Sequence, residues 1–244
     1  QGKSYLLKLI LCNMREAGMN IICLDPEGEY QDLTEKLGGC YIDLMTGGYK
    51  INLLQVRCWD EDGSPDDTEA PMAFRQTSRL SQHISFLKDF FRSYKDFTDQ
   101  HIDVIEIMVG KLYGRCGFTD RTDFKRLGPA DYPVLSDLYQ LIEAEYQAFD
   151  DDRRHLYTAD LLQEILLGLH SMCRGAEAPF FDGHTNIIDD HFIVFGVKGL
   201  LQASKNIRNA MLFNVLSFMS DALLTNGKTV VSIDEFYLFL SNLT

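Results

Sequence analysis

Apolar residues near the N-terminus recur with helical spacing and then give way to a short continuous apolar run. The recurring positions, three or four residues apart, are Leu6, Leu7, Ile10, Leu11 and Met14. This spacing predicts a helix over residues 4–17 that ends at Gly18. The run NIICLD (20–25) predicts a buried strand, and QDLTEKLGG (31–39) and CYIDL (40–44) predict a short helix and a second strand. Alternating strands and helices of this kind are typical of a parallel sheet with right-handed crossovers.

The pattern changes at Trp59, where the stretch WDEDGSPDDTEAP contains acidic residues and no basic one. The simplest interpretation of this acidic stretch is a solvated linker. From Ala73 to about Cys173 apolar residues follow a helical period, interrupted by one polar break. Within it, one aromatic stripe is interpreted as helical core and consists of Phe86, Phe90, Phe91, Tyr94 and Phe97. We therefore expect an all-α subdomain over residues 59–189.

The strand-and-helix pattern returns after the helical region. HFIVFGV (191–197) predicts a strand, residues 205–224 predict a helix, and KTVVSIDEF (228–236) predicts a further strand. The fold class expected is α/β, with a parallel-sheet core built from residues 1–58 and 190–244 and the helical subdomain inserted between them.

Composition narrows the classes of function. The chain has 244 residues and a net charge of 23 − 36 = −13, which argues against a broad nucleic-acid footprint. The stretch RTDFKRLG is the one notable basic patch. The cysteines form no C-x-x-C pair and are interpreted as reduced thiols of an intracellular protein. Apolar runs are shorter than the ~20 residues that a membrane helix needs.

Gly2, Lys3 and Ser4 stand at the start of the first predicted helix. They match the last three positions of the phosphate-binding motif G-x-x-x-x-G-K-[ST]. In such a loop the backbone N–H groups at the helix start cradle the phosphates. Lys3 would hold the β- and γ-phosphates by charge, and the Ser4 hydroxyl would bind Mg²⁺.

The strand TVVSIDEF offers the second half of a nucleotide site. Asp234 ends a mostly apolar strand, as the metal-side acid of a Walker B element does, and Glu235 follows it. A carboxylate near the phosphates binds Mg²⁺, often through water, and a second group orients or deprotonates the attacking water. We assign Asp234 to the metal and Glu235, together with Lys3, to catalysis of ATP hydrolysis. The alternative is that both acids only end a strand.

Several stretches together resemble the P-loop ATPases of conjugative transfer and type IV secretion, in the form found in Gram-positive conjugative elements and within the FtsK/HerA-like superfamily. In chain order they are GKS, LDPEGEY, INLL, FFDGHTNI, HFIVFGVKGL and VVSIDEFYLFL. The resemblance implies a RecA-like P-loop NTPase core with an inserted all-α subdomain. It also implies ATP and Mg²⁺ as cofactors and assembly of the chain with itself into dimers or hexamers.

The resemblance further implies a place in the cell and a set of partners. The ATPase would be cytoplasmic and peripheral to the inner face of the cell membrane, docked on a membrane-bound type IV secretion channel and its coupling proteins. The family's remaining phosphate-loop and sensor positions have no counterpart between Gln1 and Thr244. We therefore expect the chain to be a fragment of a larger protein that alone binds nucleotide poorly and is inactive or weakly active.

The resemblance also implies roles for two acidic residues and one asparagine. Asp25 and Glu29 match the family's acidic turn, which is expected beside the nucleotide, and a capped surface turn is the alternative. Asn52 matches the Asn of the family's IN motif, where a structural role is equally supported.

Three functions remain open from the sequence. The first is an ATPase motor of a conjugation channel. The second is a DNA-translocating ATPase of the FtsK/HerA type, which the acidic balance disfavours. The third is a non-hydrolysing scaffold, which the presence of Glu235 disfavours. The histidines show no metal-ligand spacing, and the local His/Asp cluster is interpreted as structural; it comprises Asp182, His184, Asp189, Asp190 and His191.

Overall fold

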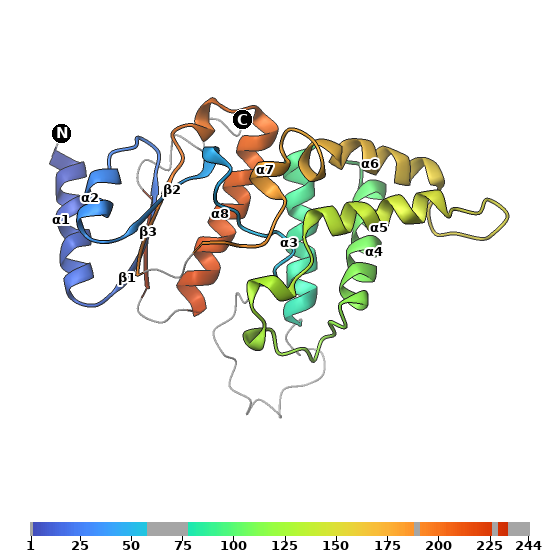
Figure 1. Ribbon diagram of the computed structural model, residues 1–244, viewed down its shortest axis with the longest axis horizontal. Helices are drawn as coiled ribbons and strands as arrows, with labels where there is room; N and C mark the ends of the chain where they lie inside the picture. The colour runs from blue at the N-terminus through green and yellow to red at the C-terminus, as the bar shows by residue number, and fades with distance from the viewer. Residues whose placement is uncertain (1, 58–77, 188–190, 226–228, 234–244) are drawn as a thin grey trace. The chain divides into compact units, whose positions relative to one another are not determined.

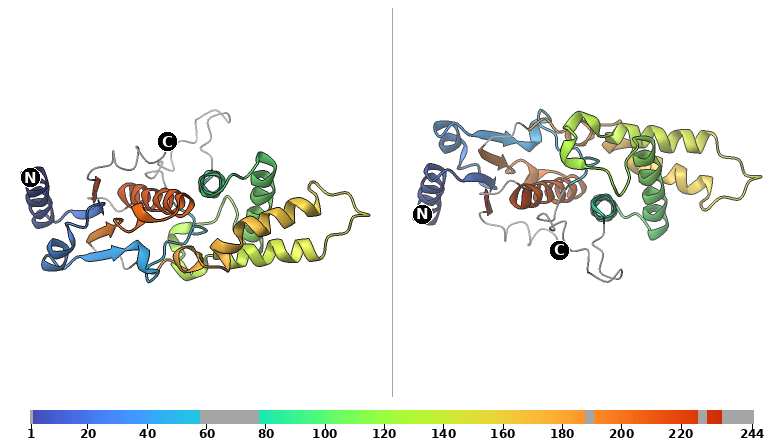
Figure 2. Two further views of the ribbon diagram at one scale, coloured as in Figure 1. Left: turned by 90° about the horizontal axis from the view of Figure 1, so that it is seen from above. Right: turned by 90° about the horizontal axis from the view of Figure 1, so that it is seen from below.

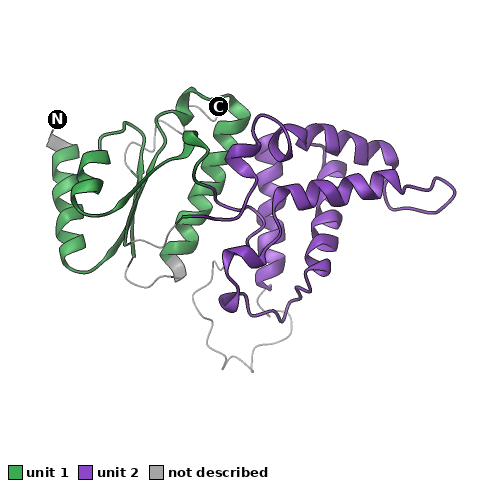
Figure 3. Cartoon of the chain, viewed as in Figure 1, with its two compact units in different colours: residues 1–49, 187–244 green, residues 50–186 purple. Residues whose placement is uncertain are grey.

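The computed structural model describes residues 2–57, 78–187, 191–225 and 229–233. The chain divides into two units, shown in different colours in Figure 3. Unit 1 consists of residues 1–49 and 187–244, and unit 2 consists of residues 50–186.

Unit 1 is built on a sheet of four parallel strands. These are β1 (Asn20–Asp25), β2 (Cys40–Asp43), β3 (Phe192–Gly196) and β4 (Thr229–Ile233). Their order across the sheet is β2-β3-β1-β4, so strands from the beginning and the end of the chain alternate. β1 and β3, the two inner strands, consist almost wholly of buried residues, as is typical of parallel strands whose sheet is covered on both faces. The predicted α/β class with a parallel sheet is confirmed.

Helices cover both faces of this sheet (Figures 1 and 2). On one face lie α1 (Gly2–Glu16) and α2 (Gln31–Lys36), and α8 (Lys205–Thr225) lies on the other. Phe218 of α8 meets Phe195 of β3 edge-on, with ring centroids 5.9 Å apart. Two short 3-10 helices, η1 (Leu44–Thr46) and η5 (Leu200–Gln202), follow β2 and β3.

Only some of the apolar residues of α1 pack against the sheet. Leu11 is buried against Ile21 and Cys23 of β1, and Leu7 and Met14 pack beside it. Two other members of the predicted apolar face are exposed: Leu6 by 57% and Ile10 by 38%. The spacing of the five residues predicted the helix correctly, but it did not indicate which of them the sheet covers.

Unit 2 is all-helical within its described residues. It contains α3 (Arg79–Tyr94), α4 (Asp99–Arg115), α5 (Leu135–Gln147), α6 (Ala159–Cys173), α7 (Ala178–Phe181) and the 3-10 helices η3 (Phe124–Arg126) and η4 (Pro129–Asp131). Most of the predicted aromatic stripe is buried, as expected of a helical core: Phe86, Phe90, Phe91 and Tyr94. No helix in the described parts of the chain has the length and apolar character needed to cross a membrane.

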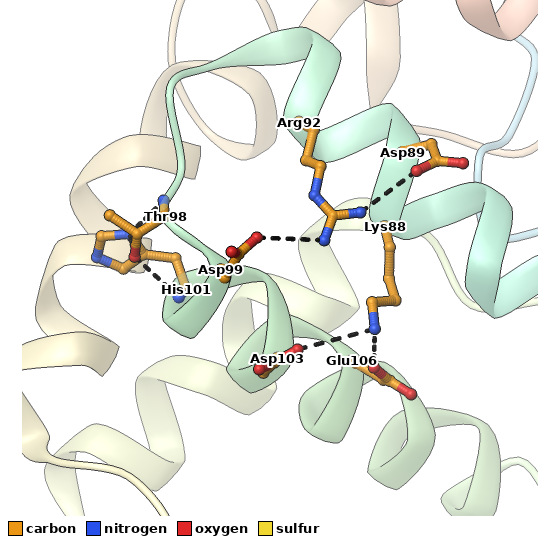
Figure 4. A network of polar contacts seen from close by, with 8 residues as sticks. All are labelled: Lys88, Asp89, Arg92, Thr98, Asp99, His101, Asp103 and Glu106. Atoms are coloured by element: carbon orange, nitrogen blue, oxygen red, sulfur yellow. Dashed lines mark hydrogen bonds and ion pairs between the residues drawn. The ribbon is translucent and has the colours of Figure 1, made fainter.

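Polar side chains join α3 to α4 on the outside of this core (Figure 4). Lys88 of α3 forms an ion pair with Glu106 of α4, and Arg92 Nη2 lies 3.5 Å from Asp99 Oδ1. The hydroxyl of Thr98 accepts a hydrogen bond at the start of α4 and so caps the helix. These contacts fix how two consecutive helices pack.

Lys50–Arg57 has no helix or strand and belongs to unit 2. Asn52 Nδ2 donates a hydrogen bond to the carbonyl of Pro133 (2.9 Å), and the Tyr113 hydroxyl donates one to the carbonyl of Leu54 (2.8 Å). The sequence prediction placed the junction after residue 58. The structure places it at residue 50, because this segment makes its buried hydrogen bonds with loops and helices of the helical unit.

Candidate nucleotide site

The start of α1 and the end of β1 lie at the same edge of the sheet. α1 runs into β1 through a tight turn with Gly18 at φ +81°, so the two elements are antiparallel. Residues 4–16 of the helix and the six residues of β1 both span about 20 Å. Lys8 Nζ lies 5.3 Å from the centroid of the Tyr30 ring, which shows that the first half of α1 is beside the turn that follows β1.

The structure describes the predicted site residues to different extents. Gly2, Lys3 and Ser4 form the first turn of α1, and the Ser4 side chain is half-buried. Asp234 and Glu235 lie outside the described residues. β4 is described as far as Ile233, which is paired with Leu24 of β1. The carboxyl ends of β1 and β4 are therefore level with each other.

Asp25 ends β1 and organises the acidic turn, defined here as residues 25–30. Its side chain is 0% exposed. Oδ1 accepts hydrogen bonds from the backbone N–H groups of Gly28 (2.9 Å) and Glu29 (3.1 Å), and Oδ2 accepts one from Tyr30 (3.0 Å). Gly28 has φ +74°, a conformation that favours glycine and lets the backbone curl around the carboxylate. Charge-assisted bonds of this kind are about twice as strong as neutral ones.

Tyr41 of β2 reaches the same carboxylate from across the sheet. Its hydroxyl donates a hydrogen bond of 3.2 Å to Asp25 Oδ2. β3 lies between β2 and β1, and Gly196 is the residue of β3 that pairs with Asp25. A Cβ at Gly196 would lie 2.7 Å from Tyr41 Cζ, so the ring crosses β3 over a position that has no side chain. Burial, followed by the charge and hydrogen bond of Asp25, raises the pKa of Tyr41, and the hydroxyl remains a donor.

Charges of both signs surround the acidic turn. The side chains of Glu27 and Glu29 are exposed on it, and Lys198, directly after β3 and Val197, is exposed as well. Lys198 Cδ lies 3.5 Å from the position that a Cβ of Gly28 would occupy, so its aliphatic stem runs along the turn. With Lys8 stacked on Tyr30, two lysines accompany the acids at this edge.

Cys23 and Ser232 lie on neighbouring strands behind this edge. The two residues pair in the register of β1 and β4, with Cys23 buried and Ser232 half-buried. Burial, and then the charge of Asp25, raises the pKa of the Cys23 thiol to about 12. The thiol is therefore protonated at neutral pH and is not a nucleophile. Ser232, which interrupts the apolar run of β4, pairs with this cysteine in the register of the sheet.

Asn52 serves unit 2 and has a structural role there. It is 1% exposed. Besides its bond to Pro133, its Oδ1 accepts a hydrogen bond from Leu54 N–H (3.0 Å), and its own N–H donates to Thr185 Oγ1 (2.9 Å). Of the two roles that the sequence left open for Asn52, these contacts favour the structural one.

Three residues at the sheet edge were not identified from the sequence. Lys8 lies in an ordinary helical context, and Lys198 lies in the HFIVFGVKGL stretch, to which no nucleotide-binding role was assigned. Gly196 does carry a signal, because an isolated glycine at the end of a buried strand often marks a close approach by another group. Among the residues described here, no cluster of three or more His, Cys, Asp or Glu side chains could hold a metal ion.

The comparisons agree with this architecture. The sequence matches the family described as "Helicase HerA, central domain" over residues 1–166. Among solved structures, the chain is similar to VirB4 of Thermoanaerobacter pseudethanolicus, with 29% sequence identity and a TM-score of 0.79. The likeness covers 97% of this chain and 58% of the VirB4 chain, so this chain spans little more than half the length of that relative. No curated protein matches it.

Proposed function

The chain belongs to the family of the helicase HerA central domain, and from this membership we propose that it is the ATP-hydrolysing domain of a conjugative type IV secretion ATPase. The observation that carries the proposal is the likeness to VirB4 over 97% of this chain. It is supported by the Gly-Lys-Ser sequence in the first turn of α1, at the edge where β1 and β4 end.

The roles proposed for the site follow the charges that develop during phosphoryl transfer. Mg²⁺ bound with ATP would neutralise the negative charge on the phosphate oxygens. Lys3 binds the β- and γ-phosphates, and the Ser4 hydroxyl and the Asp234 carboxylate hold the metal, Asp234 directly or through water. Glu235 orients the attacking water and accepts its proton. Glu29 contributes its exposed carboxylate from the acidic turn beside the nucleotide.

The residues described at this edge fit a nucleotide. The helix start offers backbone N–H groups, which the motif directs at phosphates, and Ser4 is half-buried within that first turn. The exposed acids of the turn stand beside Lys8 and Lys198, so the edge is polar and of mixed charge. Such an edge, at the carboxyl ends of parallel strands, is where α/β proteins bind ligands.

We further propose that the ATPase works as a dimer or hexamer of this chain. Its partners would be a membrane-bound type IV secretion channel and its coupling proteins, at the cytoplasmic face of the cell membrane. The name of the matched family favours a second function, that of a DNA-translocating ATPase of the HerA type. The net charge of −13 weighs against it, because a DNA-tracking surface is expected to be basic.

ATP turnover of the full-length protein, measured with and without DNA, separates these functions. We expect Mg²⁺-dependent hydrolysis that DNA leaves unchanged and that Glu235→Gln lowers by about 100-fold or more, since a positioned general base contributes about 10²–10⁴-fold. Strong stimulation by DNA would replace the secretion motor with the translocase. Hydrolysis unaffected by Glu235→Gln would contradict the proposed mechanism.

A further inference from the structure

We propose that Tyr41 and Gly196 act as positioning residues for the nucleotide site, by holding the Asp25 carboxylate and, through it, the acidic turn that carries Glu29. The proposal rests on the function proposed above and goes beyond it, because it gives a role to residues of two strands that contain none of the nucleotide-binding motifs.

Asp25 acts on the site through the backbone of the turn. The side chain is 0% exposed, so it offers no surface to a nucleotide or to a hydrated metal. Its two oxygens accept hydrogen bonds from three consecutive N–H groups, at Gly28, Glu29 and Tyr30. The carboxylate thus fixes the peptide units on both sides of the Glu29 Cα. The direction in which the Glu29 side chain leaves the turn depends on these bonds.

Tyr41 holds the Asp25 carboxylate in place. Asp25 Oδ2 lies between the N–H of Tyr30 and the hydroxyl of Tyr41, at 3.0 and 3.2 Å. Rotation of the carboxylate away from the turn would break the bond to the tyrosine as well. The backbone of Asp25 is held as well, because Val197 N–H, directly after β3, donates a hydrogen bond of 3.1 Å to the Asp25 carbonyl.

Gly196 makes this contact possible. In the register of the sheet, Gly196 pairs with Asp25 on one side and with Asp43 on the other, whereas Tyr41 pairs with Val194. The tyrosine ring therefore crosses β3 diagonally, above the glycine. Any Cβ there would lie within 3 Å of ring atoms, and the flexible ring would move aside and take its hydroxyl away from Asp25. Gly196→Ala should therefore reproduce the effect of Tyr41→Phe.

The first test needs no nucleotide. Hydrogen exchange of the Gly28, Glu29 and Tyr30 amides is compared between the wild-type full-length protein and the Tyr41→Phe and Gly196→Ala variants. We expect both variants to exchange these amides about 3- to 10-fold faster, the range that corresponds to loss of one hydrogen bond. Tyr49→Phe and Gly48→Ala are the controls, since Gly48 has room for a Cβ at ordinary contact distance. Unchanged exchange in both variants would overturn the proposal.

The second test asks whether the turn matters for turnover. We expect each variant to lower the kcat for ATP by about 3- to 10-fold with KM changed less than about two-fold, because a misplaced group on the turn affects the transition state more than substrate binding. The double variant should be no slower than either single variant, since both remove the same contact. Faster exchange with unchanged kcat would make the contact merely structural and overturn its positioning role.

The two measurements separate the failure of this proposal from that of the proposed function. A wild-type protein without ATP hydrolysis would contradict the ATPase function and the positioning role together, and the exchange data would still decide whether the Tyr41 hydroxyl holds the turn. Multiplied effects in the double variant would show that Gly196 and Tyr41 act separately and would contradict the shared contact.

Discussion

His83 is expected to make unit 2 sensitive to acid. The imidazole is 0% exposed on α3, and its Nε2–H donates a hydrogen bond of 2.7 Å to the carbonyl of Leu53. Burial, and then the nearby charge of Arg57, lowers the pKa of His83 to about 3, although the bond to Leu53 acts in the opposite direction. The rings of Phe86 and Tyr113 lie beside it, with centroids 5.4 and 6.5 Å away. The native protein therefore holds this histidine neutral.

The size of the effect follows from proton linkage. In the unfolded chain His83 has an ordinary pKa of about 6.5, so between pH 6.5 and 3 the unfolded state binds one more proton than the native state. The free energy of unfolding then falls by up to about 1.4 kcal/mol for each pH unit, and by about 2.7 kcal/mol in all between pH 8 and 4.5. Well above pH 6.5 both states hold the histidine neutral and the contribution is constant.

The assay compares wild type with His83→Gln, whose side-chain N–H can still donate to Leu53 and does not titrate. Urea unfolding followed by far-UV circular dichroism gives the free energy of unfolding from pH 4.5 to 8. Subtracting the two curves cancels the titration of all other groups, and His155→Gln, at an exposed position, controls for the substitution. A difference curve that rises by about 1.4 kcal/mol per pH unit below 6.5 and is flat above 7.5 supports the reasoning. Parallel curves would refute it.

Three further predictions concern the stability of unit 2. Gly110 lies within α4 with open space around it, so Gly110→Ala should raise the free energy of unfolding by about 0.5–1 kcal/mol. Gly117 also has open space but has φ +77°, so Gly117→Ala should lower the free energy of unfolding by about 1 kcal/mol. The two substitutions should therefore shift Tm in opposite directions, and shifts of the same sign would contradict this. Asn52→Ala leaves the buried Pro133 carbonyl and Leu54 N–H without their hydrogen-bond partner, so the free energy of unfolding in urea should fall by about 2–4 kcal/mol. A loss below about 1 kcal/mol would show that water takes the place of the Asn52 side chain. Lys88→Met breaks the half-exposed pair with Glu106 and should cost at most about 1 kcal/mol, a loss that disappears at high salt; a larger, salt-independent loss would mean that the side chain packs rather than pairs.

The sheet could be predicted from sequence because its strands are short apolar runs with clear ends. NIICLD and HFIVFGV are buried on both faces, and such strands read as continuous apolar stretches. Which residues of α1 face that sheet was less predictable. Leu6 and Ile10 satisfy the helical period as well as Leu7 and Leu11 do, and periodicity alone does not say which row of side chains the sheet covers.

From the sequence, residues of the candidate site could be proposed only where a local motif marks them. The DPEGEY stretch predicts a turn, but the bond from Tyr41 to Asp25 depends on the strand order β2-β3-β1, which no local pattern encodes. The junction between the units is a similar case. Asn52 is tied to the helical unit by a long-range hydrogen bond to Pro133, which lies far along the chain, whereas the sequence shows only the change in composition at Trp59.

The most direct test of the account is the steady-state Mg²⁺-ATP turnover of the full-length protein with and without the substitution Lys3→Ala. Lys36→Ala, at the last residue of α2, serves as the matched control. If the first turn of α1 binds the β- and γ-phosphates, turnover falls at least about 100-fold in Lys3→Ala, is unchanged in Lys36→Ala, and is abolished in all variants when Mg²⁺ is removed. Turnover that survives Lys3→Ala would show that this helix start does not hold the phosphates and would contradict the central claim.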